Sequence, residues 1–144
     1  MNETEFWSLI ESIDVQLVDT DDEDRALASL SKSLENSPAH AITEFQEHLS
    51  RFLYQLDGAK YAAHAGSSGH SGDGFLYVRC YVIAKGRQFF ERVVVDPIVL
   101  GECADKWCEE LLYVAASAWE STQGGEFEYE PSVSYETGSN EHQW

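Results

Sequence analysis

Apolar residues recur at helical spacing in the first third of the chain. The first stripe predicts a helix that begins after Asn2, which forms a capping pair with Glu5. A second helix is predicted from Thr20, where the T-x-x-E spacing of residues 20–23 repeats that capping pattern. The apolar positions of the two stripes are Phe6, Leu9, Ile10, Ile13, Leu17, Leu27, Leu30 and Leu34.

A third helix is predicted from Ser37-Pro38 to Asp57-Gly58. Serine is a favourable N-cap, proline is tolerated at the first helical position, and glycine accepts the left-handed conformation that ends many helices. The buried face of this helix should hold Ile42, Phe45, Leu49, Phe52, Leu53 and Leu56.

The segment FLYVRCYVIAKG (residues 75–86) is ambiguous, because it is apolar at both the strand period and the helix period. Its Val, Ile and Tyr residues favour a strand, whereas Asp73 as an N-cap favours a helix. Residues 87–95 follow too closely for a standard hairpin turn. Asp96-Pro97 ends that segment and can begin another helical turn. Beyond it, Trp107, Leu111, Val114 and Ala118 predict an amphipathic helix over residues 102–121.

After Ser121 the composition changes. Residues 122–144 contain five glutamates and no Lys or Arg, which predicts an acidic tail with a short extended piece at residues 126–130. The sequence therefore predicts a helical domain over residues 1–121 followed by the tail. The expected fold is all-α, a single-domain bundle of about five to seven helices with a partly extended C-terminal tail.

Net charge narrows the classes of partner. The formal charge of the 144 residues is −17, so phosphate backbones and anionic lipids are repelled and a basic protein is favoured. High negative charge also serves simply to keep a small protein in solution. The N-terminus lacks a basic region followed by an apolar run, and the three cysteines form no close pair. We therefore expect a cytoplasmic protein whose Cys80, Cys103 and Cys108 are reduced and mostly buried.

Several motifs together resemble a known family. F-W-x-L-I at residues 6–10, D-x-F-x-Y-x-R-x-Y-x-I-x-x-G-R at residues 73–87 and E-x-L-x-Y-x-A-x-x-A-W at residues 109–119 are similar to those of a widespread bacterial family of small domains of unknown function. The resemblance covers roughly residues 3–120 and leaves out the tail. It implies an all-helical domain, and thus a helix over residues 75–86, but no reaction.

The loop GSSGHSGDGF (residues 66–75) resembles two catalytic motifs, but its details exclude the first and disfavour the second. A phosphate loop needs Lys and Ser or Thr after its last glycine, and neither residue follows here. The hydrolase elbow G-x-S-x-G begins at Gly69, but Asp73 occupies the place of its last glycine. We expect this loop to serve as the start of a helix capped by Asp73.

Polar residues near this loop suggest a pocket. The candidates for an enzyme or a small-ligand-binding domain are His64, His70, Asp73, Arg79 and Arg87. Their spacing matches no compact ligand motif, so no metal or cofactor is predicted, and a buried Arg79 would need a carboxylate such as Glu91 or Asp96. Residues 19–24 are not an EF-hand, because the sixth and twelfth positions lack glycine and glutamate.

Two functions remain. The favoured hypothesis is an acidic immunity protein, or antitoxin, that blocks a toxic enzyme such as a nuclease by occupying its basic surface. The alternative is the enzyme or ligand-binding domain built on the polar pocket. The residues expected to contact a toxin are Asp19, Asp21, Asp22, Glu23, Asp24, Glu126, Glu128, Tyr129, Glu130 and Tyr135.

Overall fold

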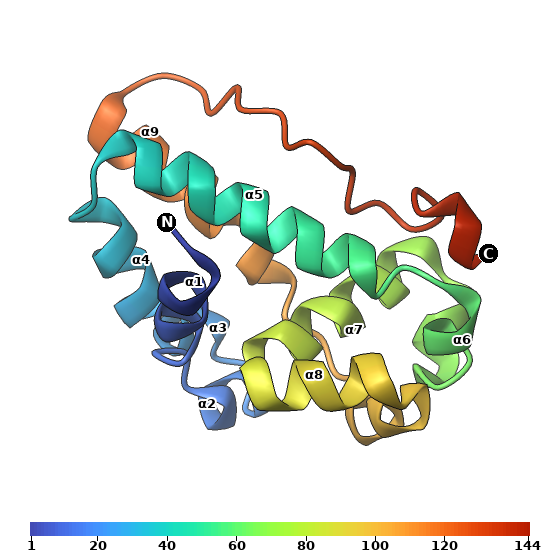
Figure 1. The fold of residues 1–144 in the computed structure, drawn as a ribbon. Helices are drawn as coiled ribbons and strands as arrows, with labels where there is room; N and C mark the ends of the chain where they lie inside the picture. The colour runs from blue at the N-terminus through green and yellow to red at the C-terminus, as the bar shows by residue number, and fades with distance from the viewer.

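The computed structural model describes residues 1–144 and contains helices and connecting segments without any strand (Figure 1). The predicted all-α fold is confirmed, and the ambiguous segment lies mostly within one helix. The helices are shorter and more numerous than the spacing of apolar residues had predicted. They are α1 (Glu3–Ile10), α2 (Val15–Asp19), α3 (Glu23–Ala26), α4 (Ala28–Glu35), α5 (Ala39–Gln55), α6 (Ala59–Ala62), α7 (Gly72–Ala84), α8 (Arg87–Val95) and α9 (Val114–Gln123), with 3-10 helices η1 (Gly66–His70), η2 (Pro97–Cys103), η3 (Glu109–Tyr113) and η4 (Glu141–Gln143).

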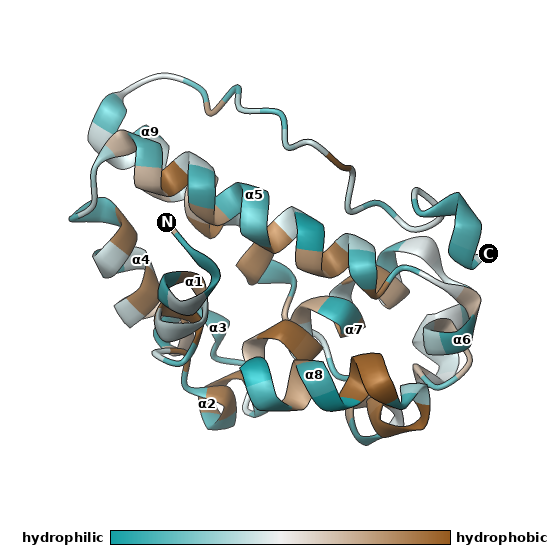
Figure 2. Cartoon of the chain, in the orientation of Figure 1, coloured by the Kyte–Doolittle hydropathy of each residue, from teal (hydrophilic) through white to brown (hydrophobic).

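Two helices organise the core. The amphipathic helix α5 buries the predicted apolar face against the other helices, and Figure 2 shows hydrophilic and hydrophobic residues interleaved along it. Helix α7 is buried on nearly every side, since α5, α8, η1 and η3 all pack against it. A helix with no solvent face has no polar stripe, which explains why its sequence pattern was ambiguous. No helix in the structure combines the length and apolar composition needed to cross a bilayer.

The opening helix begins as predicted. The Glu5 backbone N–H donates to Asn2 Oδ1 and the Asn2 N–H donates to Glu5 Oε2, both at 2.8 Å, which confirms the capping box. Behind this cap, Phe6 and Trp7 are buried against rings from α5 and α8. The Phe52 ring centroid lies 5.3 Å from that of Phe6 and 4.8 Å from that of Trp7. The F-W pair therefore anchors α1 to the core.

The next two boundaries differ from the prediction. One stripe over residues 6–17 is divided between α1 and α2, because Asp14 starts a new helix by accepting hydrogen bonds from the N–H groups of residues 16 and 17 at 3.1 and 3.4 Å. Thr20 does not cap the following helix. Its hydroxyl donates to a carbonyl within α2, while Asp22 caps α3.

Glycine and proline act differently from the prediction at the ends of α5. Pro38 is the N-cap, one residue later than expected for Ser37. Gly58 has an extended backbone (φ −169°) and precedes α6, so it does not end α5 in a left-handed conformation. A Cβ atom at Gly58 would lie 2.8 Å from the Cβ of Gln143. Glycine at this position therefore makes room for the end of the chain.

Two later predictions also need correction. Ser71 rather than Asp73 caps α7, because its Oγ accepts a hydrogen bond from the Gly74 N–H at 3.1 Å, while Asp73 lies exposed in the first turn. The helix predicted over residues 102–121 is interrupted. Residues 104–108 are not helical, and a 3-10 turn separates them from α9.

The chain after α9 runs back along α5 without regular structure until η4 (Figure 1). Residues 126–130 form no strand. Glu47 of α5 holds this stretch, accepting hydrogen bonds from the Tyr129 hydroxyl and the Ser132 N–H, both at 2.8 Å. Burial pushes the pKa of Glu47 upward, but the hydrogen bonds from Ser132, Arg51 and Tyr129 outweigh it and lower the pKa to about 2.

A buried guanidinium joins the tail to the core. Arg79 of α7 is fully buried and stacks on the ring of Phe75, with its Cζ 4.7 Å from the ring centroid. Its NH1 donates to the carbonyl oxygens of Leu53 and Tyr135 at 2.9 and 3.0 Å, and its NH2 donates to Thr137 Oγ1 at 2.9 Å. Burial lowers the pKa of this guanidinium.

The predicted carboxylate partner of Arg79 is wrong. Neither Glu91 nor Asp96 contacts it: Glu91 pairs with Arg87, and Asp96 caps η2 by accepting from the Ile98 N–H. Arg79 uses carbonyl and hydroxyl oxygens in place of a carboxylate.

Asp57 holds the last residues of the tail. This carboxylate is fully buried and accepts hydrogen bonds from the backbone N–H groups of Gly138 and Asn140 and from the indole N–H of Trp144, at 3.0, 2.8 and 2.9 Å. Such charge-assisted bonds are stronger than neutral ones. The tail therefore supplies the donors for a buried anion and two of the three acceptors for a buried cation.

The first prediction concerns this anchor. Asp57→Ala should lower the free energy of unfolding by about 3 kcal/mol, because it leaves three donors without their acceptor, and Asp57→Asn should cost less. Urea unfolding followed by circular dichroism measures both variants. The exposed Asp73→Ala is the matched control and should change stability by less than about 0.5 kcal/mol. Equal losses in the alanine variants would contradict an anchoring role for Asp57.

Candidate functional site

A pocket rich in carboxylates lies where α2, α3 and α7 meet the irregular segment 104–108. Its volume is about 460 Å³. Its lining residues come from α2, the turn after it, the start of α3, Tyr81 of α7, and residues 105–107. We call this the acidic pocket, and its lining consists of Val18, Asp19, Asp21, Glu23, Tyr81, Asp105, Lys106 and Trp107.

Two residues of the acidic pocket have a backbone conformation that L-residues seldom adopt. Asp21 and Asp105 have φ values of 60° and 59°, and they are the only residues other than glycine with positive φ in the structure. Aspartate tolerates this left-handed region better than most residues, yet the conformation remains unfavourable. Backbone strain of this kind concentrates at functional sites, where the surrounding structure maintains it.

Asp105 is held by residues 66–71, which we call the glycine-rich loop. Its carboxylate accepts hydrogen bonds from the backbone N–H groups of Ser67 and Ser68 at 3.3 and 2.8 Å, and from their hydroxyls at 3.0 and 2.7 Å. The bonds from Ser68 and then Ser67 lower the pKa of Asp105 to about 2. Gly66 has a φ of +74°, and a Cβ there would lie 2.4 Å from the Asp105 carboxylate. The loop therefore shapes the acidic pocket.

Trp107 is positioned by the same loop. Its indole N–H donates to Ser68 Oγ at 3.0 Å, and its ring meets the Tyr77 ring edge-on at 5.2 Å between centroids. The side chain nevertheless remains 49% exposed. A tryptophan that is fixed on one side and open to solvent on the other suits a binding anchor.

One residue that lines the acidic pocket, Tyr81, has a buried phenol ring. The Tyr81 hydroxyl donates to the Asp19 carboxylate at 2.5 Å. Burial and this bond raise the pKa of Tyr81, so its hydroxyl stays protonated at neutral pH. Lys106 lies over the same ring, with its Nζ 5.6 Å from the centroid. It is the only Lys or Arg in the lining, so negative charge prevails.

Glu23 shows the cost of gathering these acids. Its carboxylate is half-buried and accepts a hydrogen bond from the Glu110 N–H at 3.0 Å. Burial raises the pKa of Glu23, the Glu110 N–H lowers it in part, and the charges of Glu110, Glu109 and Asp21 raise it further. The net shift is upward. Carboxylates that repel one another in this way favour the approach of a cation.

The negative surface continues beyond the acidic pocket. Asp24, Glu110 and Tyr113 line a neighbouring depression of about 120 Å³. Tyr113 is 43% exposed, and its hydroxyl donates to Glu109 at 3.1 Å. We call this surface, together with Glu109, which accepts from Tyr113, the acidic face. It consists of Asp19, Asp21, Glu23, Asp24, Asp105, Glu109 and Glu110 and the exposed rings of Trp107 and Tyr113.

The structure brings together most of the first acidic group that the sequence singled out. Asp19, Asp21 and Glu23 line the acidic pocket, and Asp24 lies in the adjoining depression. Asp22 instead caps α3, and its carboxylate pairs with Arg25 at 3.4 Å.

The acidic and aromatic residues of the tail lie elsewhere. Glu126 and Glu128 are exposed, while the Tyr129 hydroxyl is bound to Glu47. Glu130 and Tyr135 line a different cavity, which shares no residue with the acidic pocket. The two predicted contact regions therefore lie in different pockets, although Tyr113 lines both the tail cavity and the depression beside the acidic pocket.

The polar group proposed as an alternative site does not converge on one cavity. Arg79 is buried and bonds the tail, whereas Arg87 pairs with Glu91 at 3.0 Å and with Glu3 at 3.8 Å. His70 and Asp73 are exposed, and His64 follows α6 half-buried. No group of three or more His, Cys, Asp or Glu side chains is arranged to hold a metal ion.

Sequence reasoning missed five of the eight residues that line the acidic pocket. Asp105, Lys106 and Trp107 were not chosen because residues 102–121 were assigned to one helix. Val18 and Tyr81 lie in other elements, and nothing in their sequence pattern marked them as site residues. The donor-rich loop at residues 66–71 was a usable signal, since its N–H and hydroxyl groups require an acceptor elsewhere in the chain.

Comparison with known proteins gives the family of this chain. Residues 1–121 match the model of a family described as a protein of unknown function (DUF4240). The chain belongs to this family. No curated protein and no solved structure matches it. The description of the DUF4240 family states no activity, so the function is argued below from the site itself.

A titration tests the electrostatics of Glu23. The pKa of Glu23 is raised above 4.5 in the folded state, so folding is penalised at any pH where the glutamate of the unfolded chain is ionised. This penalty is present at pH 7 and disappears below pH 4.5. Glu23→Gln keeps the acceptor for Glu110 and should raise the melting temperature slightly at pH 7 but not below pH 4.5. Glu126→Gln, on the exposed tail, is the control. A benefit that grows as the pH falls would contradict the upward shift.

Proposed function

We propose that this protein is an acidic immunity-type inhibitor that binds the basic surface of a toxic enzyme through its acidic face. The observation that carries the proposal is a half-exposed Trp107 fixed among carboxylates. Tryptophan supplies the packing energy of an interface centre, and the surrounding acids supply attraction and selectivity for a positive partner.

Electrostatics favour this class of partner. The chain carries a net charge of −17, and Lys106 is the single cation in the acidic pocket. Enzymes that cleave nucleic acids gather Lys and Arg in their substrate clefts, because they neutralise phosphates. A nuclease cleft is thus complementary to the acidic face, and long-range attraction would accelerate association.

Preorganisation supports the same role. The indole of Trp107 is held by Ser68, and Asp105 is held by four hydrogen bonds from the glycine-rich loop. Groups that are already fixed lose little conformational entropy on binding. In this proposal the complex forms in the cytoplasm, where Cys80, Cys103 and Cys108 remain free thiols.

The partner is sought by using the whole protein as bait in a lysate of its own cells. Support requires that the captured protein is an enzyme with a basic site and that the bait inhibits it stoichiometrically. Capture of no such enzyme, or capture without inhibition, would overturn the proposal.

Charge variants then test the acidic face. The triple variant Asp19→Asn, Asp21→Asn and Glu23→Gln removes three charges yet keeps the acceptors for Tyr81 and Glu110, and asparagine also tolerates the left-handed backbone at position 21. Stopped-flow measurement should show an association rate about tenfold slower at low salt, with a smaller difference at high salt.

The matched control removes three charges from the tail through Glu126→Gln, Glu128→Gln and Glu141→Gln. It should slow association much less than the first triple variant. Trp107→Ala should accelerate dissociation at least about tenfold, since it removes the packed anchor. Equal effects of the two triple variants would show that net charge alone, and no particular face, guides binding.

A further inference from the structure

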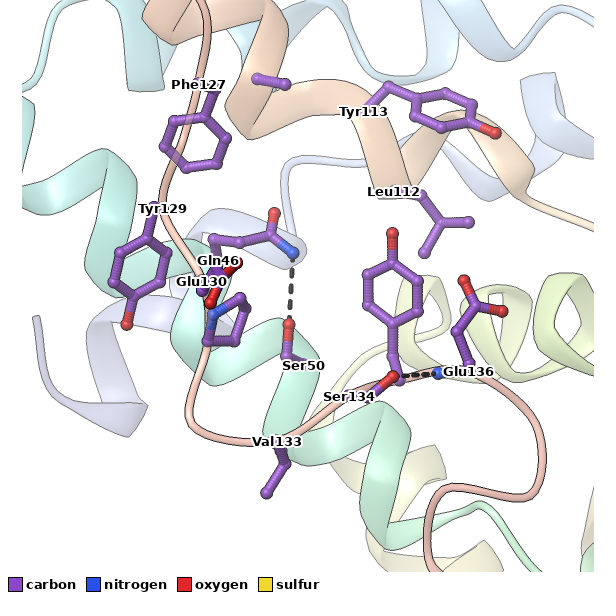
Figure 3. Close-up of a pocket in the computed structure, with 13 residues that line it drawn as sticks. Gln46, Ser50, Leu112, Tyr113, Phe127, Tyr129, Glu130, Val133, Ser134 and Glu136 are labelled. Atoms are coloured by element: carbon purple, nitrogen blue, oxygen red, sulfur yellow. Dashed lines mark hydrogen bonds between the residues drawn. The ribbon is translucent and has the colours of Figure 1, made fainter.

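A second cavity lies between α5, residues 112–116 and the tail, and Tyr113 is the one residue that it shares with the acidic face. Its volume is about 500 Å³. Figure 3 shows the side chains that line it. Helix α5 forms the floor, residues 112–116 form one side and the tail covers the rest. The residues used in the argument are Gln46, Ser50, Phe127, Glu130, Tyr135 and Glu136.

The floor of this cavity presents an unused hydrogen-bond acceptor. Gln46 is only 6% exposed, and its amide nitrogen donates to Ser50 Oγ at 3.2 Å (Figure 3). The amide oxygen of Gln46 has no hydrogen-bond partner. The only side-chain nitrogen or oxygen that is both sealed from solvent and unpartnered is Arg79 Nε, so the Gln46 oxygen is open to the cavity. An acceptor that is open to the cavity and has no partner within the protein can accept a hydrogen bond from a ligand that carries a donor.

The walls define the rest of the ligand. Phe127, Tyr129 and Tyr135 supply aromatic surface, and Glu130 and Glu136 supply carboxylates. The lining contains no Lys, Arg or His. Burial raises the pKa of Tyr135, so its phenol remains neutral and adds no charge of its own. Aromatic faces and carboxylates both attract a cation, and neither attracts an anion.

We propose that this cavity binds a small organic ammonium compound with an apolar body. The ammonium group donates to the Gln46 amide oxygen and lies in the field of Glu130 and Glu136. The apolar body packs against Phe127 and Tyr135. The tail, which completes the cavity, therefore serves binding as well as stability.

The probe is phenethylammonium, which joins one aromatic ring to one primary ammonium group. Titration of the ¹⁵N-labelled protein should give saturable shifts of the Gln46 side-chain amide and the Ala116 backbone amide, with a Kd of about 1 mM for so small a ligand. Phenylacetate and phenethyl alcohol, of similar size, should bind at least about tenfold more weakly, because they lack the positive charge. Equal binding of phenylacetate, or no saturable shift with the ammonium compound, would overturn the proposal.

Two variants locate the interaction. Gln46→Met keeps the bulk of the side chain and removes the acceptor, so the affinity should fall at least about fivefold. Glu136→Gln changes an exposed residue without threatening the fold and should weaken binding about threefold. Glu120→Gln removes an equal charge from the exposed side of α9 and should leave the Kd unchanged. Unaltered affinity in both Gln46→Met and Glu136→Gln would place the ligand elsewhere and refute the assignment.

Discussion

A buried guanidinium that has no carboxylate within hydrogen-bond contact is the constraint on which this fold depends. Removing a charge from water is costly, and the cost is offset only when hydrogen-bond acceptors replace the lost solvent. Arg79 finds one acceptor at the end of α5, in the Leu53 carbonyl, and two in the tail, at Tyr135 and Thr137. The matched family region ends at residue 121, so both tail acceptors lie outside it. In this protein the tail completes the polar interior of the helical domain.

Hydrogen bonds between distant segments also connect the glycine-rich loop to the surface. Asp105 collects the donors of Ser67 and Ser68, and Ser68 in turn accepts from Trp107. A segment that suggested catalysis in the sequence is a support for an exposed aromatic side chain. The hydrogen bonds of a loop thus determine the position of the residue on which the proposed interface is centred.

The features that the sequence predicted correctly are those controlled by interactions between residues close together in the chain. The Asn2 and Glu5 cap, the buried face of α5 and the turn that starts at Asp96-Pro97 all depend on residues within a few positions of one another. The boundaries that were wrong involved competition between neighbouring caps, as at Ser71 and Asp73. A stripe of apolar residues also could not show that residues 104–108 interrupt a helix, because the left-handed Asp105 is stabilised by a distant loop.

The candidate site was predictable only in part for the same reason. Asp19, Asp21, Glu23 and Asp24 were found because they are adjacent in sequence, whereas Tyr81 and Trp107 reach the same place through the fold. The tail contacts of Arg79 and Asp57 lie 56 to 87 residues away along the chain, beyond any local pattern.

The carboxylates of the acidic pocket differ in their response to acid. Asp105 keeps its charge until the pH approaches 2, because four donors surround it, whereas Glu23 takes up a proton more readily than an ordinary glutamate. As the pH falls, Glu23 therefore becomes neutral while the Asp105 carboxylate still accepts hydrogen bonds from Ser67 and Ser68. In weak acid the acidic pocket therefore loses part of its negative charge while the hydrogen bonds of Asp105 remain. Acidity would weaken the attraction for a cationic partner before it altered the position of Trp107.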